Sequence, residues 1–370
     1  MRRLGVGLVV LGALLSVSCG SRKLVVGVML PETGINKGYG ASLKSGIKVA
    51  LDDAVAKQSP AGIEARYRDS ASRPEYAQKE TSDLFKAGAL IVIGGATSGE
   101  AKFMIPEAEK AKGVIISPSA SEPGLAASSN LFFRVVPSDD VEGIVAANFL
   151  VTQRKTKTIL VLYQEGLYAG GLLPVFSNEV TKLGARIADK LRIGPTDWDK
   201  PIGDALAAGK PDAVFICAYA EETLAALEVI RGAKFAGTVC ATSAMVTADV
   251  IRRAGALAEG VFVPMVAYDP DSQQEPTKSF VKRYKAANNG VTPDLYAAYG
   301  YDAAMAAVYA LQGPPPDNTS QLLQRLMSLG DKRGVTGKLT FDSGGDITNR
   351  PRIHCIRSGK LVDCDPSPAG

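Results

Sequence analysis

The stretch IVIGGATSGEAKFMIPEAEKAKGVIISPSAS, residues 91–121, decides the fold that we expect for this chain. It begins in a short apolar run that ends at Gly94-Gly95, as expected for a buried strand that enters a tight loop. Thr97 and Ser98 then stand just before a helical pattern, where an N-cap residue belongs. This order of strand, loop and capped helix is typical of an α/β sheet protein.

A second predicted strand, residues 113–117, leads into another loop rich in hydroxyl groups, Ser119-Ala120-Ser121. Two neighbouring strands would thus each end in Ser or Thr side chains and free backbone N–H groups. In an open parallel sheet the carboxyl edge is where ligands bind, and a helix N-terminus there favours an anion such as a carboxylate. The alternative is a pair of ordinary capped strand–helix turns with no ligand.

The same alternation of strand and helix continues along the chain, which predicts an α/β fold with two doubly wound parallel-sheet halves that change over near Pro137-Ser138. We place Tyr39-Gly40 in a Gly-rich loop after the first strand. A helical block and isolated strands at the end predict that the chain crosses back to the first half and returns, which makes a hinged clamp. The predicted strands are residues 23–30, 63–69, 89–93, 113–117, 131–136, 158–163, 186–191, 213–219, 238–242, 260–265 and 337–341, and the later helices are residues 171–183, 201–208, 221–231, 247–254, 276–287, 295–311 and 320–329.

The first 18 residues have the layout of an export signal. Arg2-Arg3 precede an uncharged apolar run over residues 4–17, which is shorter than the roughly 20 residues that span a bilayer. Residues 16–19 resemble a bacterial lipobox, in which Cys19 would carry the lipid, although Ser16 stands where an aliphatic residue is usual. Cleavage without a lipid is the alternative. With either outcome we expect a protein exported to the periplasm or cell envelope.

Composition excludes several classes of protein. The chain is 46% hydrophobic and 22% charged, which is ordinary for a globular protein. Its length of 370 residues is enough for two domains. The net charge of +4 is spread along the chain without a run of like charges, so nothing indicates a nucleic-acid partner. We expect a monomer without a cofactor.

The cysteines fit an exported protein. Cys355 and Cys364 flank a hairpin-like segment that turns at Ser358-Gly359, and a disulfide there would contribute about 2–3 kcal/mol on the chain-entropy model. Cys217 and Cys240 stand inside apolar strand-like runs and are expected to be buried thiols. There is no CxxC motif, and the single histidine, His354, lies near the end of the chain, so no metal site is expected.

Several long stretches resemble one known family throughout the length that follows the signal. These stretches are VVGVMLPETGINKGYGASLKSGIKVALDDA, RDSASRPEYAQKETSDLF, VIGGATSG, VIISPSAS, FFRVVPSDD and YAAYGYDAA. On them the chain is similar to type I periplasmic solute-binding proteins of the branched-chain amino-acid (Leu/Ile/Val-binding) class, the receptor components of ABC importers. The resemblance implies partners in the form of ABC permease subunits and three crossings between lobes, near residues 137, 264–269 and 335–337. It divides the chain into lobe 1, residues 23–136 plus 268–334, and lobe 2, residues 138–265 plus 336–364.

The resemblance also implies a set of ligand-binding residues. A hydroxyl and an N–H group in the Thr97-Ser98 loop would hold a ligand carboxylate, to which charge-assisted hydrogen bonds are about twice as strong as neutral ones. The loop matching residues 119–121 would add a hydroxyl group and a carbonyl that faces an ammonium. For each tyrosine the alternative is an ordinary half-buried aromatic side chain. The implied ligand-binding residues are Tyr39, Thr97, Ser98, Ser119, Ala120, Ser121, Tyr168, Tyr219 and Ser243.

One departure from the family leaves the ligand open. Where amino-acid binders often carry an acidic residue for the ammonium, this chain has Ser243, which cannot balance a buried charge. Glu221 or Glu222 could supply the charge, or tyrosine faces could hold the cation. Otherwise the ligand has no ammonium and is an amide, a urea-like compound or an organic acid.

Two other function classes compete with solute transport. Catalysis is disfavoured, because the chain has no G-x-S-x-G, HExxH or GxxxxGK[ST] motif and GGATSGE lacks the lysine of a phosphate-binding loop. A sensor or envelope scaffold of the same fold would signal to a membrane partner instead of feeding a permease. Neighbouring genes for a permease and an ATPase would favour transport, and a neighbouring histidine kinase or cell-wall synthase would favour the alternative.

Overall fold

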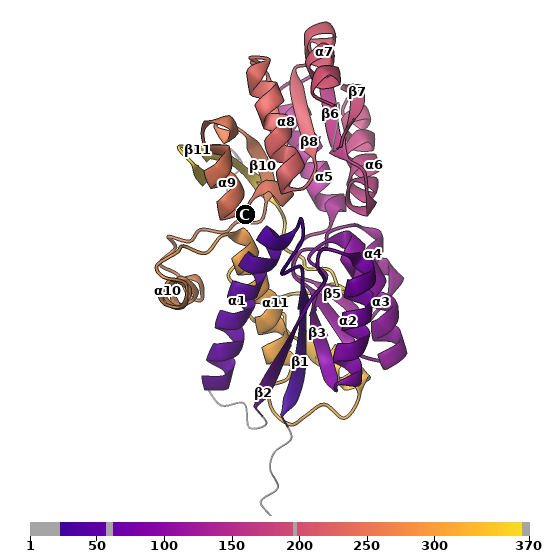
Figure 1. Ribbon diagram of the computed structural model, residues 1–370, viewed down its shortest axis with the longest axis vertical. Helices are drawn as coiled ribbons and strands as arrows, with labels where there is room; N and C mark the ends of the chain where they lie inside the picture. Colours follow the sequence, from indigo (N-terminus) through magenta and orange to yellow (C-terminus); the bar gives the residue numbers. More distant parts are fainter. Residues whose placement is uncertain (1–22, 57–61, 195–197, 365–370) are drawn as a thin grey trace, which may run out of the picture.

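The computed structural model describes residues 23–56, 62–194 and 198–364, which form two α/β lobes stacked along the long axis of the molecule (Figure 1). Each lobe is built on its own sheet, as the alternation of elements predicted. The predicted signal segment, residues 1–18, and Cys19 lie outside the described residues. Within the described ranges, no helix has the length and apolar character needed to cross a membrane.

The first lobe contains a parallel five-stranded sheet in the order β2-β1-β3-β4-β5. Its side chains alternate between two helical layers, with Val26 and Val28 packed in one core and Met29 in the other. Helices α1 (Lys37–Ala56) and α11 (Leu295–Ala310) cover one face, and α2 (Pro74–Lys86) and α3 (Ser98–Ala111) cover the other. The strands are β1 (Leu24–Leu30), β2 (Ile63–Asp69), β3 (Ala89–Gly94), β4 (Val114–Ser117) and β5 (Phe132–Arg134), and a short helix α4 (Gly124–Ser128) precedes β5.

The second lobe repeats this topology. Its parallel strands follow the order β7-β6-β8-β9-β10, and the antiparallel hairpin β11-β12 extends the sheet beyond β10. The strands are β6 (Thr158–Gln164), β7 (Arg186–Ile193), β8 (Ala213–Cys217), β9 (Thr238–Ala241), β10 (Phe262–Met265), β11 (Arg352–Arg357) and β12 (Lys360–Asp363). Their helices are α5 (Asp139–Asn148), which continues as a π-helical turn (Phe149–Gln153), α6 (Leu167–Lys182), α7 (Asp199–Gly209), α8 (Ala220–Gly232) and α9 (Ala248–Ala254), with 3-10 turns at Ser243–Met245 and Gly255–Ala258.

Helices α1 and α11 pack unusually closely because glycines stand at their crossing. A Cβ atom on Gly46 would lie 1.9 Å from the Ala297 carbonyl oxygen, and one on Gly300 would lie 2.3 Å from the Leu43 carbonyl oxygen. Any larger residue at either position would therefore force the helices apart. Two further helices, α10 (Thr277–Ala287) and α12 (Thr319–Met327), complete the C-terminal helical block.

The tail differs from the sequence-based expectation. Residues 337–341 form no regular strand, and Asp346 bridges to Arg134 at the edge of the first sheet. The buried Arg134 guanidinium donates to both Asp346 carboxylate oxygens, at 2.5 and 2.9 Å. The need to pair this buried charge keeps the segment on the first lobe, and the chain joins the second sheet only at Arg352. The lobe boundary expected between residues 334 and 336 therefore lies later in the chain.

Two helices start earlier than predicted, and both shifts concern the site. Helix α1 begins at Lys37, so Tyr39 lies in its first turn and not in a loop. Helix α6 begins at Leu167, which places Tyr168 in its first turn. The predicted start of this helix was residue 171. A Cβ on Gly171 would lie 2.7 Å from Pro123 of the first lobe, so this glycine lets the lobes meet.

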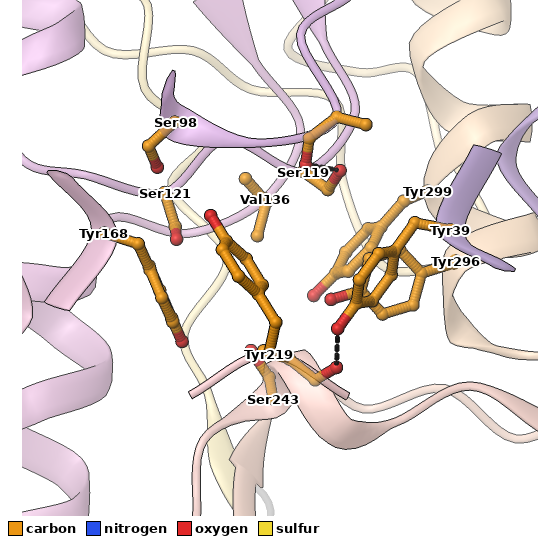
Figure 2. A pocket seen from close by; sticks show the side chains of 12 residues that line it. Tyr39, Ser98, Ser119, Ser121, Val136, Tyr168, Tyr219, Ser243, Tyr296 and Tyr299 are labelled. Atoms are coloured by element: carbon orange, nitrogen blue, oxygen red, sulfur yellow. Dashed lines mark hydrogen bonds between the residues drawn. The ribbon is translucent and has the colours of Figure 1, made fainter. Parts of the chain in front are cut away.

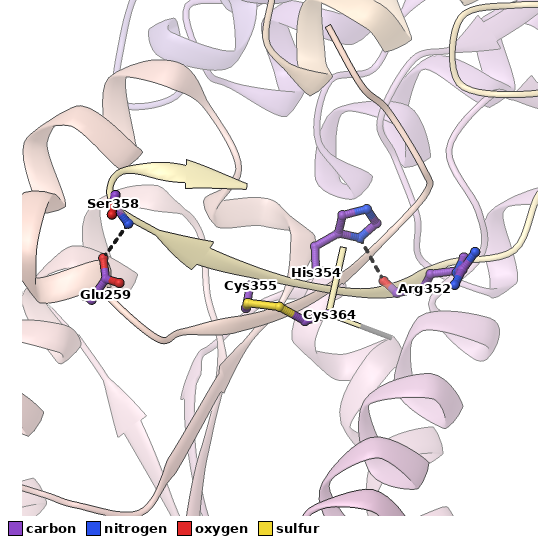
Figure 3. Close-up of a disulfide and its surroundings, with 6 residues drawn as sticks. All are labelled: Glu259, Arg352, His354, Cys355, Ser358 and Cys364. Carbon is purple, nitrogen blue, oxygen red and sulfur yellow. Dashed lines mark hydrogen bonds between the residues drawn. A yellow bond between two sulfur atoms is a disulfide. The ribbon is translucent and has the colours of Figure 1, made fainter. Parts of the chain in front are cut away.

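The C-terminal hairpin carries the disulfide (Figure 3). The Sγ atoms of Cys355 and Cys364 are bonded, with Cα atoms 5.8 Å apart. The hairpin turns at Ser358-Gly359, where both residues have positive φ, and the Ser358 N–H donates to Glu259 at 2.8 Å. Cys217 and Cys240 are free, buried thiols in the second sheet. Across the described ranges, no cluster of His, Cys, Asp and Glu could hold a metal ion.

Candidate ligand-binding site

A pocket lies between the lobes, at the carboxyl ends of strands from both sheets (Figure 2). Parallel sheets bind ligands at this edge. The lobes are nearly closed on each other here, and the cavity has a volume of only about 20 Å³. It is lined by Tyr39, Ala96, Ser98, Ser119, Ser121, Val136, Tyr168, Tyr219, Ser243, Ala244, Tyr296 and Tyr299.

The first lobe contributes the N-terminus of α3. Thr97 is the N-cap of this helix and forms a capping box with Glu100, whose backbone N–H donates to the Thr97 hydroxyl at 3.3 Å. Thr97 thus fixes the helix start and does not line the pocket. The next residue, Ser98, lines it, and its hydroxyl oxygen accepts from the Glu122 N–H at 3.2 Å.

The loop after β4 supplies two more hydroxyl groups to the pocket wall. Ser119 donates to the Ala96 carbonyl at 2.7 Å, and Ser121 faces the pocket (Figure 2). Ala120 was among the expected ligand-binding residues of this loop, but its side chain is buried in the core and its carbonyl accepts from Arg134 at 3.3 Å. Of the three loop residues, only the two serines therefore reach the pocket.

Tyrosines form most of the remaining wall. The rings of Tyr168 and Tyr219 stack with centroids 5.2 Å apart, and Tyr219 extends across the pocket toward Ser121 (Figure 2). Tyr296 and Tyr299, which the sequence reading did not select, stand three residues apart on α11 and face the pocket together. Their spacing in the stretch YAAYGYDAA could have predicted this, because residues i and i+3 lie on the same face of a helix.

Tyr39 links the two lobes. Its hydroxyl donates to the Ala244 carbonyl at 2.7 Å and accepts from the Ala220 N–H at 2.9 Å, and both partners belong to the second lobe. Burial raises the pKa of Tyr39 far above the ordinary range, so the group stays a neutral donor. Tyr39, one of the expected ligand-binding residues, thus lines the pocket and also joins the two lobes.

Ser243 has an acidic partner that the sequence reading missed. The carboxylate of Glu142, on α5, accepts from the Ser243 N–H at 2.8 Å and from its hydroxyl at 2.7 Å. Burial raises the pKa of Glu142 to about 7, although the two hydrogen bonds from Ser243 act to lower it. Glu221 and Glu222 serve other groups: Glu221 pairs with Arg253 at the surface, and Glu222 accepts from Gln164. Neither lines the pocket.

A second buried acid, Asp139, lies one helical turn from Glu142. Its side chain has no exposed surface, and neither carboxylate oxygen has a hydrogen-bond partner in the described structure. Its backbone N–H donates to the Ser121 carbonyl at 2.9 Å, which places it next to the pocket wall. Burial raises the pKa of Asp139 well above its usual range, and the charge of Glu142 raises it further. The nearby Ser121 hydroxyl acts to lower this pKa, although its geometry does not meet the criteria for a hydrogen bond. Acidic residues in the first turn of a helix are common, so no local pattern distinguished Asp139.

The chain belongs to a family described as periplasmic binding protein, whose sequence profile matches residues 23–364. A curated relative, Leu/Ile/Val-binding protein homolog 2 of Brucella abortus, is 24% identical over 349 residues, which is 89% of each chain. The leucine-, isoleucine-, valine-, threonine-, and alanine-binding protein of Pseudomonas aeruginosa is 24% identical over 328 residues, 86% of each chain.

Solved structures show the same fold. LivJ from Streptococcus pneumoniae, a branched-chain amino acid transporter substrate binding protein in complex with isoleucine, has a TM-score of 0.83 at 22% identity and covers 92% of this chain and 98% of its own. An ABC transporter solute binding protein from R. palustris in complex with benzoate has a TM-score of 0.82 at 18% identity, covering 93% and 96%. The two-lobed α/β architecture is therefore shared by proteins whose bound ligands differ in chemistry.

Proposed function

We propose that this protein is an extracytoplasmic receptor of an ABC importer, which captures an amino acid or a related small carboxylate or amide between its lobes. The observation that carries the proposal is the convergence of Ser98 and Ser121 with Tyr168 and Tyr219 in one inter-lobe pocket. Membership of the periplasmic binding protein family supports a binding role in place of catalysis.

In this proposal the ligand carboxylate lies at the N-terminus of α3. The positive end of the helix dipole and the hydroxyl groups of Ser98 and Ser121 would both favour an anion there. Charge-assisted hydrogen bonds of this type are short and strong, and they are directional enough to orient the ligand. Tyr168 and Tyr219 would then close over the ligand from the second lobe.

Closure would couple capture to delivery. A ligand that contacts both lobes stabilises the closed form by its differential affinity, and a permease that recognises only this form would receive loaded receptor. The hydrogen bonds of Tyr39 with Ala220 and Ala244 join the two lobes directly. They would therefore stabilise the closed form together with the ligand. An export signal at residues 1–18 and a lipid on Cys19 would place a monomeric receptor beside its permease.

A thermal-shift screen over amino acids, amides, ureas and organic acids, followed by calorimetry on each hit, tests the proposal. A ligand present at 100 times its Kd stabilises the folded protein by about 2.7 kcal/mol, which is a shift of several degrees. Binding of one amino acid or related solute, lost on substitution of the pocket serines, is the expected result. If no such solute raises the Tm, the proposed function is wrong.

A further inference from the structure

Asp294 accepts hydrogen bonds from both lobes. It is the N-cap of α11, and its Oδ1 atom accepts from the Ala297 N–H at 2.8 Å. Its Oδ2 atom accepts from the Ser42 hydroxyl of α1 at 2.9 Å and from the Ala248 N–H at 3.0 Å. Ala297 and Ser42 belong to the first lobe, whereas Ala248 is the first residue of α9, which lies on the side of the second lobe that faces α1 (Figure 1). One carboxylate thus caps a helix of its own lobe and also contacts the other lobe.

The backbone N–H of Ala248 depends on this contact. Ala248 follows the N-cap Thr247, and the first N–H groups of an α-helix lack acceptors within the helix. The Thr247 hydroxyl accepts from the Val250 N–H at 3.2 Å and so serves a different donor. The acceptor that Ala248 has in the structure is Asp294, across the lobe boundary. Opening the lobes would break this hydrogen bond and leave both groups to water.

The Asp294 carboxylate is held in position independently of Ala248. The hydrogen bonds from Ala297 and Ser42 lie within the first lobe, so they persist when the lobes separate. The Tyr268 hydroxyl, in the crossing expected at residues 264–269, donates to the carbonyl of the preceding residue, Pro293, at 3.3 Å. An acceptor that is fixed in advance loses little side-chain entropy on closure, so most of the free energy of the hydrogen bond favours the closed form.

We propose that Asp294 is a positioning residue for closure, and that its inter-lobe hydrogen bond with Ala248 raises the fraction of closed receptor before any ligand binds. It acts together with the bonds of Tyr39 to Ala220 and Ala244, and the lobes that these bonds join leave a cavity of only about 20 Å³. A solute that binds only the closed form has an apparent affinity proportional to the closed fraction. The inference about closure holds for any solute, and its effect on affinity rests on the proposed function.

Two variants remove opposite partners of this hydrogen bond. Asn caps helices about as well as Asp, so Asp294→Asn keeps the bond to Ala297. Its NH₂ group replaces Oδ2, however, and a donor that faces the Ala248 N–H opposes closure. Ala248→Pro removes the N–H itself, and proline is well tolerated at the first position of a helix. The preceding Thr247 already has the extended backbone that a following proline requires, with φ −109° and ψ 152°.

The measurements use the whole protein without ligand. Small-angle X-ray scattering gives the radius of gyration, and hydrogen exchange reports how often the Ala248 N–H is free of its acceptor. Loss of one hydrogen bond should lower the ratio of closed to open receptor about 2- to 12-fold. We therefore expect a larger radius of gyration for both variants, and faster exchange of Ala248 in Asp294→Asn by a similar factor. Because both substitutions act on one bond, the double variant should open no further than the more open single variant.

Ser42→Ala is the matched control. It removes the donor to the same carboxylate oxygen from within the first lobe and leaves the bond to Ala248 in place. Its radius of gyration and its Ala248 exchange rate should equal those of the original protein. Near-ultraviolet circular dichroism checks that each variant is folded, and either Asp294→Asn or Ala248→Pro is a sufficient test if the other does not fold.

The outcomes separate this inference from the proposed function. The hydrogen bond does not control closure if Asp294→Asn and Ala248→Pro keep the original radius of gyration, or if Ser42→Ala opens the lobes as far as they do. A solute identified in the thermal-shift screen should bind Asp294→Asn more weakly by the factor by which the closed fraction falls, and an unchanged affinity would contradict the inference. If no solute of the screen binds, the proposed function fails, whereas scattering and exchange still decide the inference about closure.

Discussion

The hydroxyl group of Tyr39 lies 2.7 Å from the carbonyl oxygen of Ala244, and this hydrogen bond joins the first turn of α1 in one lobe to the loop after β9 in the other. The Ala220 N–H donates to the same hydroxyl from a second direction. A single neutral side chain therefore satisfies one donor and one acceptor of the opposite lobe. This arrangement makes Tyr39 a determinant of how readily the lobes close.

Replacing Tyr39 by Phe should weaken ligand binding while leaving each lobe folded. The closed form would lose two hydrogen bonds, each worth about 0.5–1.5 kcal/mol, which predicts an affinity about 5- to 150-fold lower. Calorimetry measures the affinity, and small-angle X-ray scattering should show a larger radius of gyration. Tyr76→Phe, at an exposed position, is the control. An affinity within twofold of the original would show that the contact does not stabilise closure.

The double substitution Ser98→Ala and Ser121→Ala should abolish binding of any carboxylate ligand with little change in the fold. It removes both proposed hydroxyl donors at the N-terminus of α3, and each hydrogen bond to a charged group contributes about 1.5–3 kcal/mol. Calorimetry with the solute identified in the screen is the measurement, and Ser328→Ala is the control far along the chain. Binding within twofold would mean that the carboxylate lies elsewhere.

Ser243→Glu should weaken amino-acid binding. From the sequence alone, adding the missing acid at this position would be expected to raise affinity. The structure reverses the expectation, because the Ser243 hydroxyl donates to Glu142. A carboxylate in its place would lose this hydrogen bond and repel the buried acid, although the backbone N–H of residue 243 could still donate. A lower Tm and a lower affinity are expected, with Ser243→Ala as the milder comparison. Tighter amino-acid binding would restore the sequence-based interpretation.

The stability of the unliganded protein should fall as the pH rises through the range from about 4.5 to about 7. Burial raises the pKa of Glu142 to about 7 in the folded protein, so the folded state holds more protons than the unfolded state within this window. The raised pKa of Asp139 acts in the same direction. In Glu142→Gln the free energy of unfolding should fall less over this pH range, by on the order of 2 kcal/mol, because the titrating group is absent. The plot of Tm against pH should therefore be flatter. The exposed Glu228→Gln should leave the plot unchanged, and an identical plot for both variants would contradict the assignment.

Asp346→Ala should destabilise the protein by about 3–5 kcal/mol, because it leaves the guanidinium of the fully buried Arg134 without its carboxylate. Urea unfolding measures the change, and Asp331→Ala, which removes an exposed acid from the same tail, is the control. A loss no larger than that of the control would show that the Arg134–Asp346 pair does not hold the tail on the first lobe.

The periodic pattern of the chain predicted the fold well, because strands buried on both faces and amphipathic helices leave direct traces in the order of residues. It placed Ser98 and Ser121 at adjacent strand ends, and the structure brings both to one pocket. What it could not predict depends on contacts between distant segments. Nothing local to Asp139 or Glu142 distinguishes them from ordinary first-turn acids, and Arg134 could not be matched to Asp346 before the tail was placed.

The close crossing of α1 and α11 at Gly46 and Gly300 also constrains the order in which the molecule assembles. The first lobe begins near the start of the chain but needs a helix from its last third to complete its core. The five parallel strands of the second lobe, by contrast, are contiguous in sequence and can form before α11 has been synthesised. A nascent chain that stops short of α11 would thus expose the apolar face of α1, so the half of the receptor that is made first cannot complete its core until much of the other half has been made.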